Sequence, residues 1–402
     1  MVHNNKLPYI LALLFLLSGI KSKAEDIQIP QLSLRAQISL LTCSPDNGQL
    51  YTVYGHTAIR VVDPEIYMDA VFNYGIFDFT KPNFLYRFAK GETDYKLAVF
   101  RFDYFFDDYK ERGSEIYEQV LNLQPDELNS LWKELVINMQ PENCVYRYNF
   151  FFDNCATRPA VIIERNINGK VRFDAKQQFA TFRDVINYCT RDHPWSTFGC
   201  DLVLGLPTDR VMSPKESFFI PECLKNAFDK AEIIRDGETS PLVLKSNILS
   251  EKTLLPEPPQ PFATSPLACS ILFFTVILLI TLMEWRKKTY FRPIDIILFS
   301  IAGIAGCIVF FLSFLSVHPG TFPNISIFWL HPFHLAGIIF LLVKKFNKVA
   351  FWYHFINFAV VFVMSAAWFF IPQHFNIAFI PLIASLWLRS GTAILRRKFY
   401  VE

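Results

Sequence analysis

Residues 150–158 read FFFDNCATR, a run of three aromatic residues that ends in an acid and an amide just before Cys155. The apolar string VII follows at 161–163. This order predicts a loop or short strand leading into a helix, with Asp153 or Asn154 as the N-cap and Cys155 in the first turn. Cysteine reacts as the thiolate, and the free N–H groups and dipole of a helix N-terminus lower the pKa of a thiol. Cys155 is therefore a candidate nucleophile.

A nucleophilic thiol needs a base, and the best candidate is His56, 99 positions earlier in the chain. Residues 55–62 read GHTAIRVV, which predicts a strand with the histidine at its start. An isolated cysteine or histidine is more often an inert core residue. Here both residues open an element and are bounded by polar residues, which favours a catalytic pair.

A third polar side chain should orient such a histidine. Residues 70–79 predict the next strand, and a hairpin with residues 55–62 places Asn73 beside His56 in one register. A different register places Tyr74 or Asp78 there instead, because a shift of one residue moves every side chain to the other face. The residue pattern alone leaves these three alternatives open.

The two halves of the 402-residue chain differ sharply in composition. Residues 25–231 are charged and mixed, and the order of their apolar patterns predicts an α+β domain. Strands are expected over 32–41, 55–62, 70–79 and 95–102, and a helix over 125–139, and residues 146–152 lead into the Cys155 helix. Residues 232–261 contain DGETSP and PEPPQP, which predict a stiff, extended linker. A transmembrane domain is expected over residues 262–402.

The first 24 residues join a basic start to a short apolar core, and Ser22-Lys23-Ala24 precedes an acid, as in a cleavable signal peptide. Retention as an N-terminal anchor is the alternative. Either way the next domain is exported to a compartment where disulfides form, and Cys189 and Cys200 are the first pair expected to bond. No cysteine or histidine spacing indicates a metal, and no cofactor is expected. A net charge of +2 without a basic, aromatic patch argues against nucleic acid.

The membrane half contains five candidate spans. Residues 262–283, 294–314 and 349–371 each have about the 20 residues that a bilayer core requires. Residues 326–343 and 375–395 are interrupted by His331, His334 and Arg389. Three basic clusters, at 286–292, 344–348 and 396–398, then fall on one side, which the positive-inside rule assigns to the cytoplasm. The exported domain falls on the opposite side, in agreement with the signal sequence.

The outer loops of the membrane half carry His318, Trp329 and His331. Ionisable residues inside spans are functional-site hypotheses by default, so these three are candidates for substrate binding. The alternative is that they form interfacial loop ends, with Trp329 in the aromatic belt.

The chain resembles a known group of enzymes. A histidine on one strand, a polar residue on the next and an Asn-Cys pair opening a later helix are similar to circularly permuted papain-like proteins, which include NlpC/P60 and lecithin:retinol acyltransferase-type enzymes. More closely, it resembles the Lnb family of lipoprotein N-acyltransferases from Gram-negative bacteria. The matching strings are LTCSP at 41–45, GHTAIRV at 55–61, VFNYGIFDF at 71–79, PEN at 141–143, FFDNCATR at 151–158 and the His-Pro loops of the membrane half. Cys144 departs from this pattern, because an arginine is expected after PEN.

The resemblance implies a fold and a location. The fold is an α+β permuted papain-like domain (NlpC/P60-like and lecithin:retinol acyltransferase-like), followed by an all-α domain of five spans. The location is the bacterial inner membrane, with the N-terminal domain in the periplasm.

The resemblance also implies a reaction. Cys155 would take an acyl chain from a membrane phospholipid as a thioester, with His56 as the base, and pass it to the N-terminal amine of a diacylated lipoprotein. Alignment with the permuted group favours Asn73 as the orienting residue. The backbone N–H of Cys155 would be one oxyanion donor, and the aromatic residues 150–152 are candidates for an acyl pocket.

Three side chains near the expected pair, Tyr54, Asn154 and Arg158, are further candidates for substrate binding. Two other functions remain as alternatives. A peptidase or amidase of the NlpC/P60 type would use the same pair on cell-wall peptides, although a soluble substrate does not explain five spans. A non-catalytic envelope scaffold is the other alternative, and the presence of both Cys155 and His56 argues against it.

Overall fold

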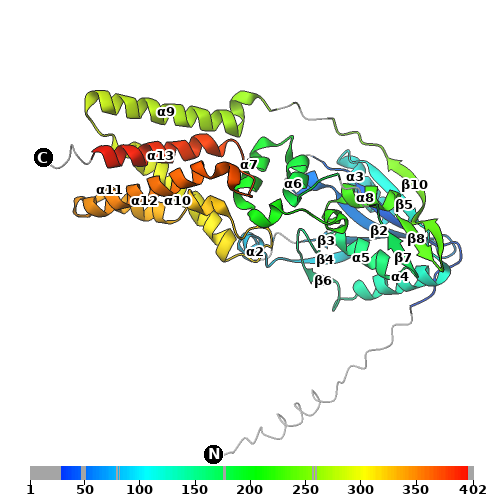
Figure 1. Ribbon diagram of the computed structural model, residues 1–402. Helices are drawn as coiled ribbons and strands as arrows, with labels where there is room; N and C mark the ends of the chain where they lie inside the picture. The colour runs from blue at the N-terminus through cyan, green and yellow to red at the C-terminus, as the bar shows by residue number, and fades with distance from the viewer. Residues whose placement is uncertain are drawn as a thin grey trace, which may run out of the picture.

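The computed structural model describes residues 29–46, 51–77, 80, 82–174, 178–255, 258 and 260–396. The signal segment expected over residues 1–24 and the alternative orienting residue Asp78 lie outside these ranges. An α+β domain and a bundle of long helices lie end to end, with α6 (Phe182–Thr190) and α7 (Pro194–Val203) between them (Figure 1). The predicted order of an α+β domain followed by a helical domain is confirmed.

The N-terminal domain is built on a seven-stranded sheet in which every neighbouring pair is antiparallel, with the order β10-β5-β1-β2-β3-β4-β6. The strands are β1 (Gln37–Cys43), β2 (His56–Asp63), β3 (Met68–Ile76), β4 (Asp94–Arg101), β5 (Ile116–Leu121), β6 (Val145–Arg147) and β10 (Val243–Ser250). The strands expected at residues 55–62, 70–79 and 95–102 are thus β2, β3 and β4, each displaced by at most a few residues.

Successive side chains of a strand point to opposite faces, and here both faces are apolar. One face, which includes Leu40, Ile59 and Phe72, packs against three helices. These are α4 (Pro125–Asn138), α5 (Thr157–Arg165) and α8 (Pro221–Asp229). The other face, which includes Ala58 and Val71, is covered by α3 (Phe102–Glu111).

The first strand is shorter than expected. Residues 32–41 alternate like a strand, but β1 begins only at Gln37. The chain turns before it, because the N–H of Ala36 donates to the carbonyl oxygen of Ser33 at 3.1 Å. The side chain of Asp63 holds this turn by accepting from both the N–H and the hydroxyl of Ser33.

The linker expected over residues 232–261 is wrong for residues 232–250. β8 (Glu232–Arg235) and β9 (Glu238–Pro241) form a hairpin that joins β7 (Lys170–Arg172) in a three-stranded sheet, and β10 extends the large sheet beside β5. The hairpin turns at Asp236-Gly237, whose φ angles are 49° and 87°. A two-residue turn of this kind needs positive φ, and Asp-Gly is its sequence signal.

The C-terminal domain contains five long helices, α9 to α13. They are α9 (Pro266–Lys287), α10 (Arg292–Phe314), α11 (Phe333–Leu342), α12 (Asn347–Ala366) and α13 (Phe379–Arg396). Within the described part of the chain, four segments are long and apolar enough to cross a membrane: α9, α10, Ile325–Leu342 with α11, and α12. These correspond to four of the five expected spans. The fifth, α13, contains Arg389 and Arg396 and is not among them by length and composition.

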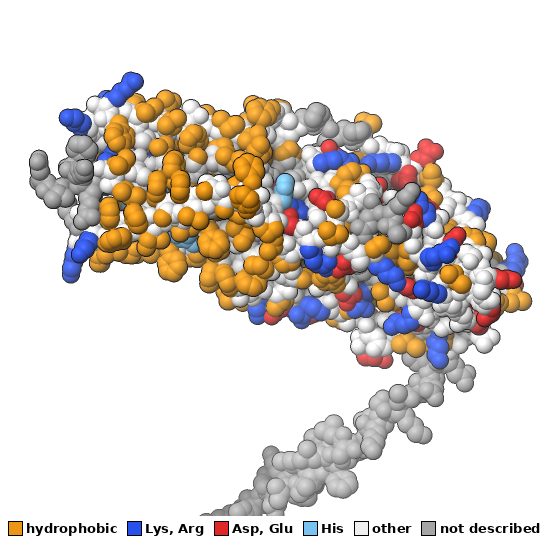
Figure 2. Space-filling view, viewed as in Figure 1, with side chains coloured by type: hydrophobic (Ala, Val, Ile, Leu, Met, Phe, Trp, Pro, Cys, Tyr) orange, Lys and Arg blue, Asp and Glu red, His pale blue; other side chains and the backbone are white. Residues whose placement is uncertain are grey.

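Apolar side chains cover the surface of the bundle, and lysines and arginines gather at its end away from the N-terminal domain (Figure 2). The basic residues at the ends of the helices there are Arg286, Lys287, Arg292 and Arg396. This distribution agrees with an orientation in which the basic end is cytoplasmic.

A buried ion network joins three helices of the bundle. Arg389 of α13 donates to Asp295 of α10 at 2.9 Å and to Glu284 of α9 at 2.6 Å, and all three side chains are buried. Arg396 also pairs with Glu284, at 2.9 Å. The interruption that Arg389 makes in the expected fifth span is therefore an inter-helix contact.

Arg389→Leu is expected to lower the free energy of unfolding of the bundle by about 3–5 kcal/mol, because it leaves the buried carboxylate of Asp295 without a cation, whereas Glu284 keeps Arg396. Thermal unfolding of the purified protein in detergent measures this loss. Adding Asp295→Asn removes the uncompensated charge and should restore most of the stability. A single variant as stable as wild type would show that the network contributes nothing.

The outer end of the bundle is bonded to the N-terminal domain through its main chain. The N–H of Gly205 donates to the carbonyl oxygen of Gly320, and that of Leu206 to the carbonyl oxygen of Pro323, both at 2.8 Å. A Cβ on Gly205 would lie 2.3 Å from the oxygen of Pro323, so this approach requires a glycine. The N-terminal domain is thus held against the end of the bundle opposite the basic clusters.

Candidate active site

His56 and Asn73 lie on neighbouring strands and share the sheet face that α3 covers. The Nε2 atom of His56 lies 2.6 Å from the Oδ1 atom of Asn73. The ring of Tyr109, on α3, stacks parallel to the imidazole with 5.9 Å between centroids. Tyr74, one of the alternatives to Asn73, points to the opposite face and is part of the main core.

The bond to Asn73 sets the tautomer of the imidazole. A carboxamide oxygen can only accept, so Nε2 carries the proton and donates it. In the neutral ring Nδ1 is then the unprotonated nitrogen, able to accept a proton. Within the described part of the chain, no hydrogen bond involves Nδ1, which leaves it available as a base.

Cys155 precedes α5, which begins at Thr157, instead of lying in its first turn. The N-cap of α5 is Ala156, so the expectation of Asp153 or Asn154 as the N-cap is wrong, and Asn154 instead shapes the turn before the helix. Its carboxamide oxygen accepts the N–H groups of Ala156 and Thr157 at 2.8 and 2.9 Å, and its nitrogen donates to two backbone carbonyls. These four bonds use the side chain of Asn154 fully, so it orients the turn that presents Cys155.

The thiol of Cys155 lies at the end of the sheet where β2 and β3 separate. Their pairing runs only to Ile59 and Phe72, and β3 is irregular beyond Asn73. A Cβ on Gly75, whose φ is 96°, would lie 3.3 Å from that of Cys155. The N–H groups of Thr57 and Cys155 and the side chain of Tyr148 lie near the thiol, where hydrogen bonding to the sulfur favours the thiolate and lowers the pKa.

These contacts place the thiol next to the residue that carries the imidazole. His56 immediately precedes Thr57, whose N–H lies near the thiol and lowers its pKa, and Nδ1 is the ring nitrogen nearer the main chain. Among the residues that the structure describes, no direct hydrogen bond joins Cys155 and His56. The structure thus brings the two predicted residues, together with Asn73, to one end of the sheet.

Burial controls the protonation of both groups. It raises the pKa of the Cys155 thiol to about 11, against the opposing effect of the three hydrogen bonds. It lowers the pKa of His56 to about 4, although the bond to Asn73 opposes this shift. The thiol pKa lowered by a helix N-terminus, expected from the sequence, is therefore wrong. At neutral pH the site holds a neutral thiol and a neutral imidazole.

Alkylation of Cys155 by iodoacetamide is expected to be slow at pH 7, because a pKa of about 11 leaves about one thiol in ten thousand ionised. The rate should rise about tenfold per pH unit from pH 7 to pH 10. Mass spectrometry of the peptide that contains Cys155 measures it, with the denatured protein as the control. A rate that levels off below pH 8 would contradict a buried, neutral thiol.

Two other predicted residues, Tyr54 and Arg158, lie close to the site. Tyr54 packs edge-on against Phe150, with 5.1 Å between ring centroids. Arg158 donates to Asp153 at 2.9 Å and lies over the ring of Tyr146, 3.7 Å from its centroid.

The three predicted residues of the outer loops are not brought to Cys155. His318 contacts the N-terminal domain, with its Nε2 atom 2.9 Å from the carbonyl oxygen of Phe88. Trp329 is buried in the core of the bundle instead of lying in an interfacial belt. His331 stacks on His334 with 3.8 Å between centroids.

All eight cysteines are free thiols, so the expected bond between Cys189 and Cys200 is wrong. Cys200 instead hydrogen-bonds with Tyr54. Burial, and next the neighbouring Cys223, raise the pKa of Cys189 to about 12.

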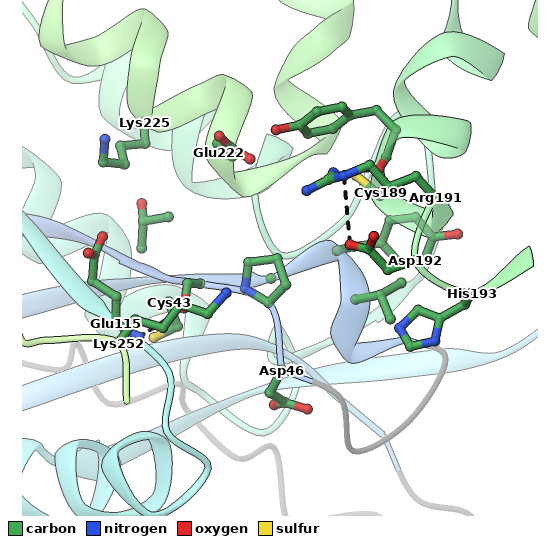
Figure 3. A pocket seen from close by; sticks show the side chains of 17 residues that line it. Cys43, Asp46, Glu115, Cys189, Arg191, Asp192, His193, Glu222, Lys225 and Lys252 are labelled. Carbon is green, nitrogen blue, oxygen red and sulfur yellow. Dashed lines mark hydrogen bonds and ion pairs between the residues drawn. The ribbon is translucent and has the colours of Figure 1, made fainter. Parts of the chain in front are cut away.

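A polar cavity of about 370 Å³ lies beside the site, on the side of β1 (Figure 3). Its walls include Tyr54, Gly55 and Cys43, and Cys43 pairs with His56 across β1 and β2. Charged side chains of both signs surround the rest of it: Asp46, Glu115, Arg191, Asp192, Glu222, Lys225 and Lys252. This lining suits a polar chain better than an acyl chain.

Three residues at the site were missed from the sequence. Gly75 leaves the space that Cys155 occupies, and Thr57 and Tyr148 lie near its thiol and lower the pKa. Gly75 and Thr57 lie inside two of the strings that carry the family resemblance, at 71–79 and 55–61, and this could have identified them. Tyr148 had none, because its place depends on the pairing of β4 with β6.

A thiol, an imidazole and a carboxamide at one end of an antiparallel sheet, on a domain held against an apolar helical bundle, define a membrane protein with a candidate cysteine active site. Residues 32–188 match the family model of the Lnb N-terminal periplasmic domain, and residues 258–398 match that of the Lnb transmembrane domain. The chain belongs to the Lnb family, and this membership points to an enzyme of the lipoprotein N-acyltransferase type. Searches of curated proteins and of solved structures found no match.

Proposed function

We propose that this protein moves an acyl chain from a membrane phospholipid to the N-terminal amine of a diacylated lipoprotein, through a thioester on Cys155. The observation that carries the proposal is the position of Cys155 against Gly75 of β3, the strand whose Asn73 also holds the Nε2 atom of His56. The inner membrane, with the site on its periplasmic side, is the proposed location.

In the first half-reaction the thiol attacks the ester carbonyl of the phospholipid. Nδ1 of His56 takes the thiol proton as the sulfur–carbon bond forms. The tetrahedral intermediate then collapses, and the lyso-lipid oxygen leaves with the proton from His56. Because Nε2 keeps its proton and its bond to Asn73 throughout, the imidazolium that forms transiently stays oriented.

The oxyanion of the intermediate needs donors close to the sulfur. The N–H groups of Thr57 and Cys155 both lie near the thiol and lower its pKa, so they are close to the carbonyl carbon that the sulfur would attack. We assign them as the two oxyanion donors. One such donor typically contributes on the order of a hundredfold in rate.

In the second half-reaction the uncharged amine of the lipoprotein attacks the thioester. His56 accepts a proton from the amine, an amide bond forms, and the sulfur leaves and regains the proton as a thiol. The polar cavity next to Gly55 supports a path for the polypeptide that follows the acceptor amine. The charged walls of the cavity lie beside β1, on one side of β2. Cys155 rests against β3, on the other side of β2.

A cell-wall peptidase and a non-catalytic scaffold remain the rival functions. The direct bonds between the N-terminal domain and the outer end of the bundle favour a substrate drawn from the membrane. The Nδ1 atom of His56 is free, and its Nε2 atom is bonded to Asn73. Both features favour a catalytic base over a non-catalytic scaffold.

Complementation tests the proposed function. A bacterial strain depleted of its own lipoprotein N-acyltransferase is expected to regain growth and triacylated lipoproteins, seen by mass spectrometry, when it produces the wild-type protein. Cys155→Ala, produced at the same level, should restore neither. Growth without N-acylated lipoproteins, or equal rescue by Cys155→Ala, would contradict the proposal.

A further inference from the structure

A continuous row of aromatic side chains connects the membrane end of the N-terminal domain with Cys155. We call it the aromatic row; it consists of Phe88 and Phe84 of α2 (Phe84–Lys90), then Phe77, Tyr95 and Tyr148. Successive ring centroids are 6.1, 6.1, 5.1 and 4.0 Å apart. The last ring lies beside Cys155, because a Cβ on Gly75 would meet Tyr148 at 3.9 Å and Cys155 at 3.3 Å.

The aromatic row is open to the surface, unlike a row packed inside a core. Tyr95 is buried, but the rings of Phe77, Phe84 and Tyr148 are partly exposed, and Phe88 is 47 % exposed. The end of the row on α2, at Phe88, is therefore its most exposed part.

The helix α2 reaches the outer end of the membrane bundle (Figure 1). None of its residues is buried, and Leu85 and Tyr86 are 78 % and 55 % exposed. The ring of Tyr86 lies 5.9 Å from that of Phe311, in the last turn of α10. The N–H of Val317 donates to the carbonyl oxygen of Lys90 at 2.9 Å. A helix with exposed apolar side chains at this level lies at the boundary between headgroups and acyl chains.

We propose that the aromatic row holds the acyl chain of an outer-leaflet glycerophospholipid, with the ester carbonyl at Cys155 and the methyl end at α2 and α10. This inference rests on the proposed function and adds the route of the donor. An ester carbonyl must leave the bilayer to reach Cys155, and the methylenes behind it would otherwise be exposed to water. Aromatic rings from the bilayer to the thiol keep that chain on apolar surface. Phe84 and Phe88 are then positioning residues for the donor.

Phe84→Ser tests the route in the full-length protein reconstituted into phospholipid vesicles. Its rate of Cys155 acylation by a long-chain glycerophospholipid should fall at least about tenfold. Its rate with a water-soluble acetyl thioester should equal that of wild type, because an acetyl group needs no apolar route. Tyr67→Ser is the matched control, since Tyr67 is an aromatic residue 97 % exposed in the turn between β2 and β3. It should match wild type with both donors.

The outcomes separate this inference from the proposed function. Wild-type rates for Phe84→Ser with the long-chain donor, or an equal loss with both donors, would overturn the aromatic row. A wild-type protein that neither donor acylates at Cys155 would overturn the proposed function itself. A phospholipid with a photoreactive group at the methyl end of its acyl chain gives a second test on wild type. It should label the peptide containing α2 and spare the peptide containing Tyr67, and the reverse would contradict the proposed route.

Discussion

Cys155→Ala is expected to lower the rate of lipoprotein N-acylation by on the order of 10⁴-fold or more, to the rate of the uncatalysed reaction. Another thiol close to His56 is that of Cys43, which lies on β1, on the opposite side of His56 from β3 and Gly75, so it is not placed to replace Cys155. The rate is measured in vesicles that contain phospholipid and a diacylated lipopeptide, by mass spectrometry of the product.

Cys144→Ala is the matched control for loss of a thiol. It removes a partly buried sulfur that does not line the polar cavity and is not the proposed nucleophile. Its transfer rate should stay within a few fold of wild type. If Cys155→Ala transferred acyl chains as fast as Cys144→Ala, another residue would be the nucleophile.

His56→Gln is expected to slow the acylation of Cys155 at pH 7 by about 10²–10⁴-fold, the usual contribution of a positioned general base. The pH dependence distinguishes a lost base from a damaged fold. In wild type the imidazole is neutral above its pKa of about 4, so the single-turnover rate should be constant above about pH 5 and fall as the pH drops through 4. In His56→Gln the acid limb should vanish, and the rate should follow the thiolate upward by about tenfold per pH unit.

Asn73→Ala gives the comparison for a residue that acts through His56. A bond to a charged group contributes about 1.5–3 kcal/mol, so the loss should be about 10- to 100-fold. The acid limb should remain and move to lower pH, because the bond to Asn73 raises the pKa of His56.

A His56→Gln rate within tenfold of wild type at pH 7 would contradict the role of the imidazole.

The sequence was sufficient for the parts that depend on local patterns. The strand that begins at His56 and the apolar spans each follow from residues close together in the chain, whereas the N-cap of α5 is Ala156 and not Asp153 or Asn154. Asn73 was one of three alternatives, and the hydrogen bond to His56 distinguishes it from Tyr74.

Properties that depend on tertiary packing could not be predicted from the sequence. A helix N-terminus favours a thiolate, but the burial of Cys155 has the larger effect and raises the pKa of its thiol. β10 looks like part of a linker by composition, and only the free edge of β5 gives it a partner. The aromatic row combines residues from β4, α2 and the segment before Cys155, whose proximity no spacing in the sequence reveals.

The central claim is that the sulfur of Cys155 carries the acyl chain between the two lipids. The most direct measurement is the mass of the intact wild-type protein after brief exposure to phospholipid vesicles that contain no acceptor. The account predicts a mass increase of one acyl group, located on Cys155, that disappears when a diacylated lipopeptide is added. Transfer to the lipopeptide with no acyl group on Cys155 at any time, or an acyl group that the lipopeptide does not remove, would contradict it.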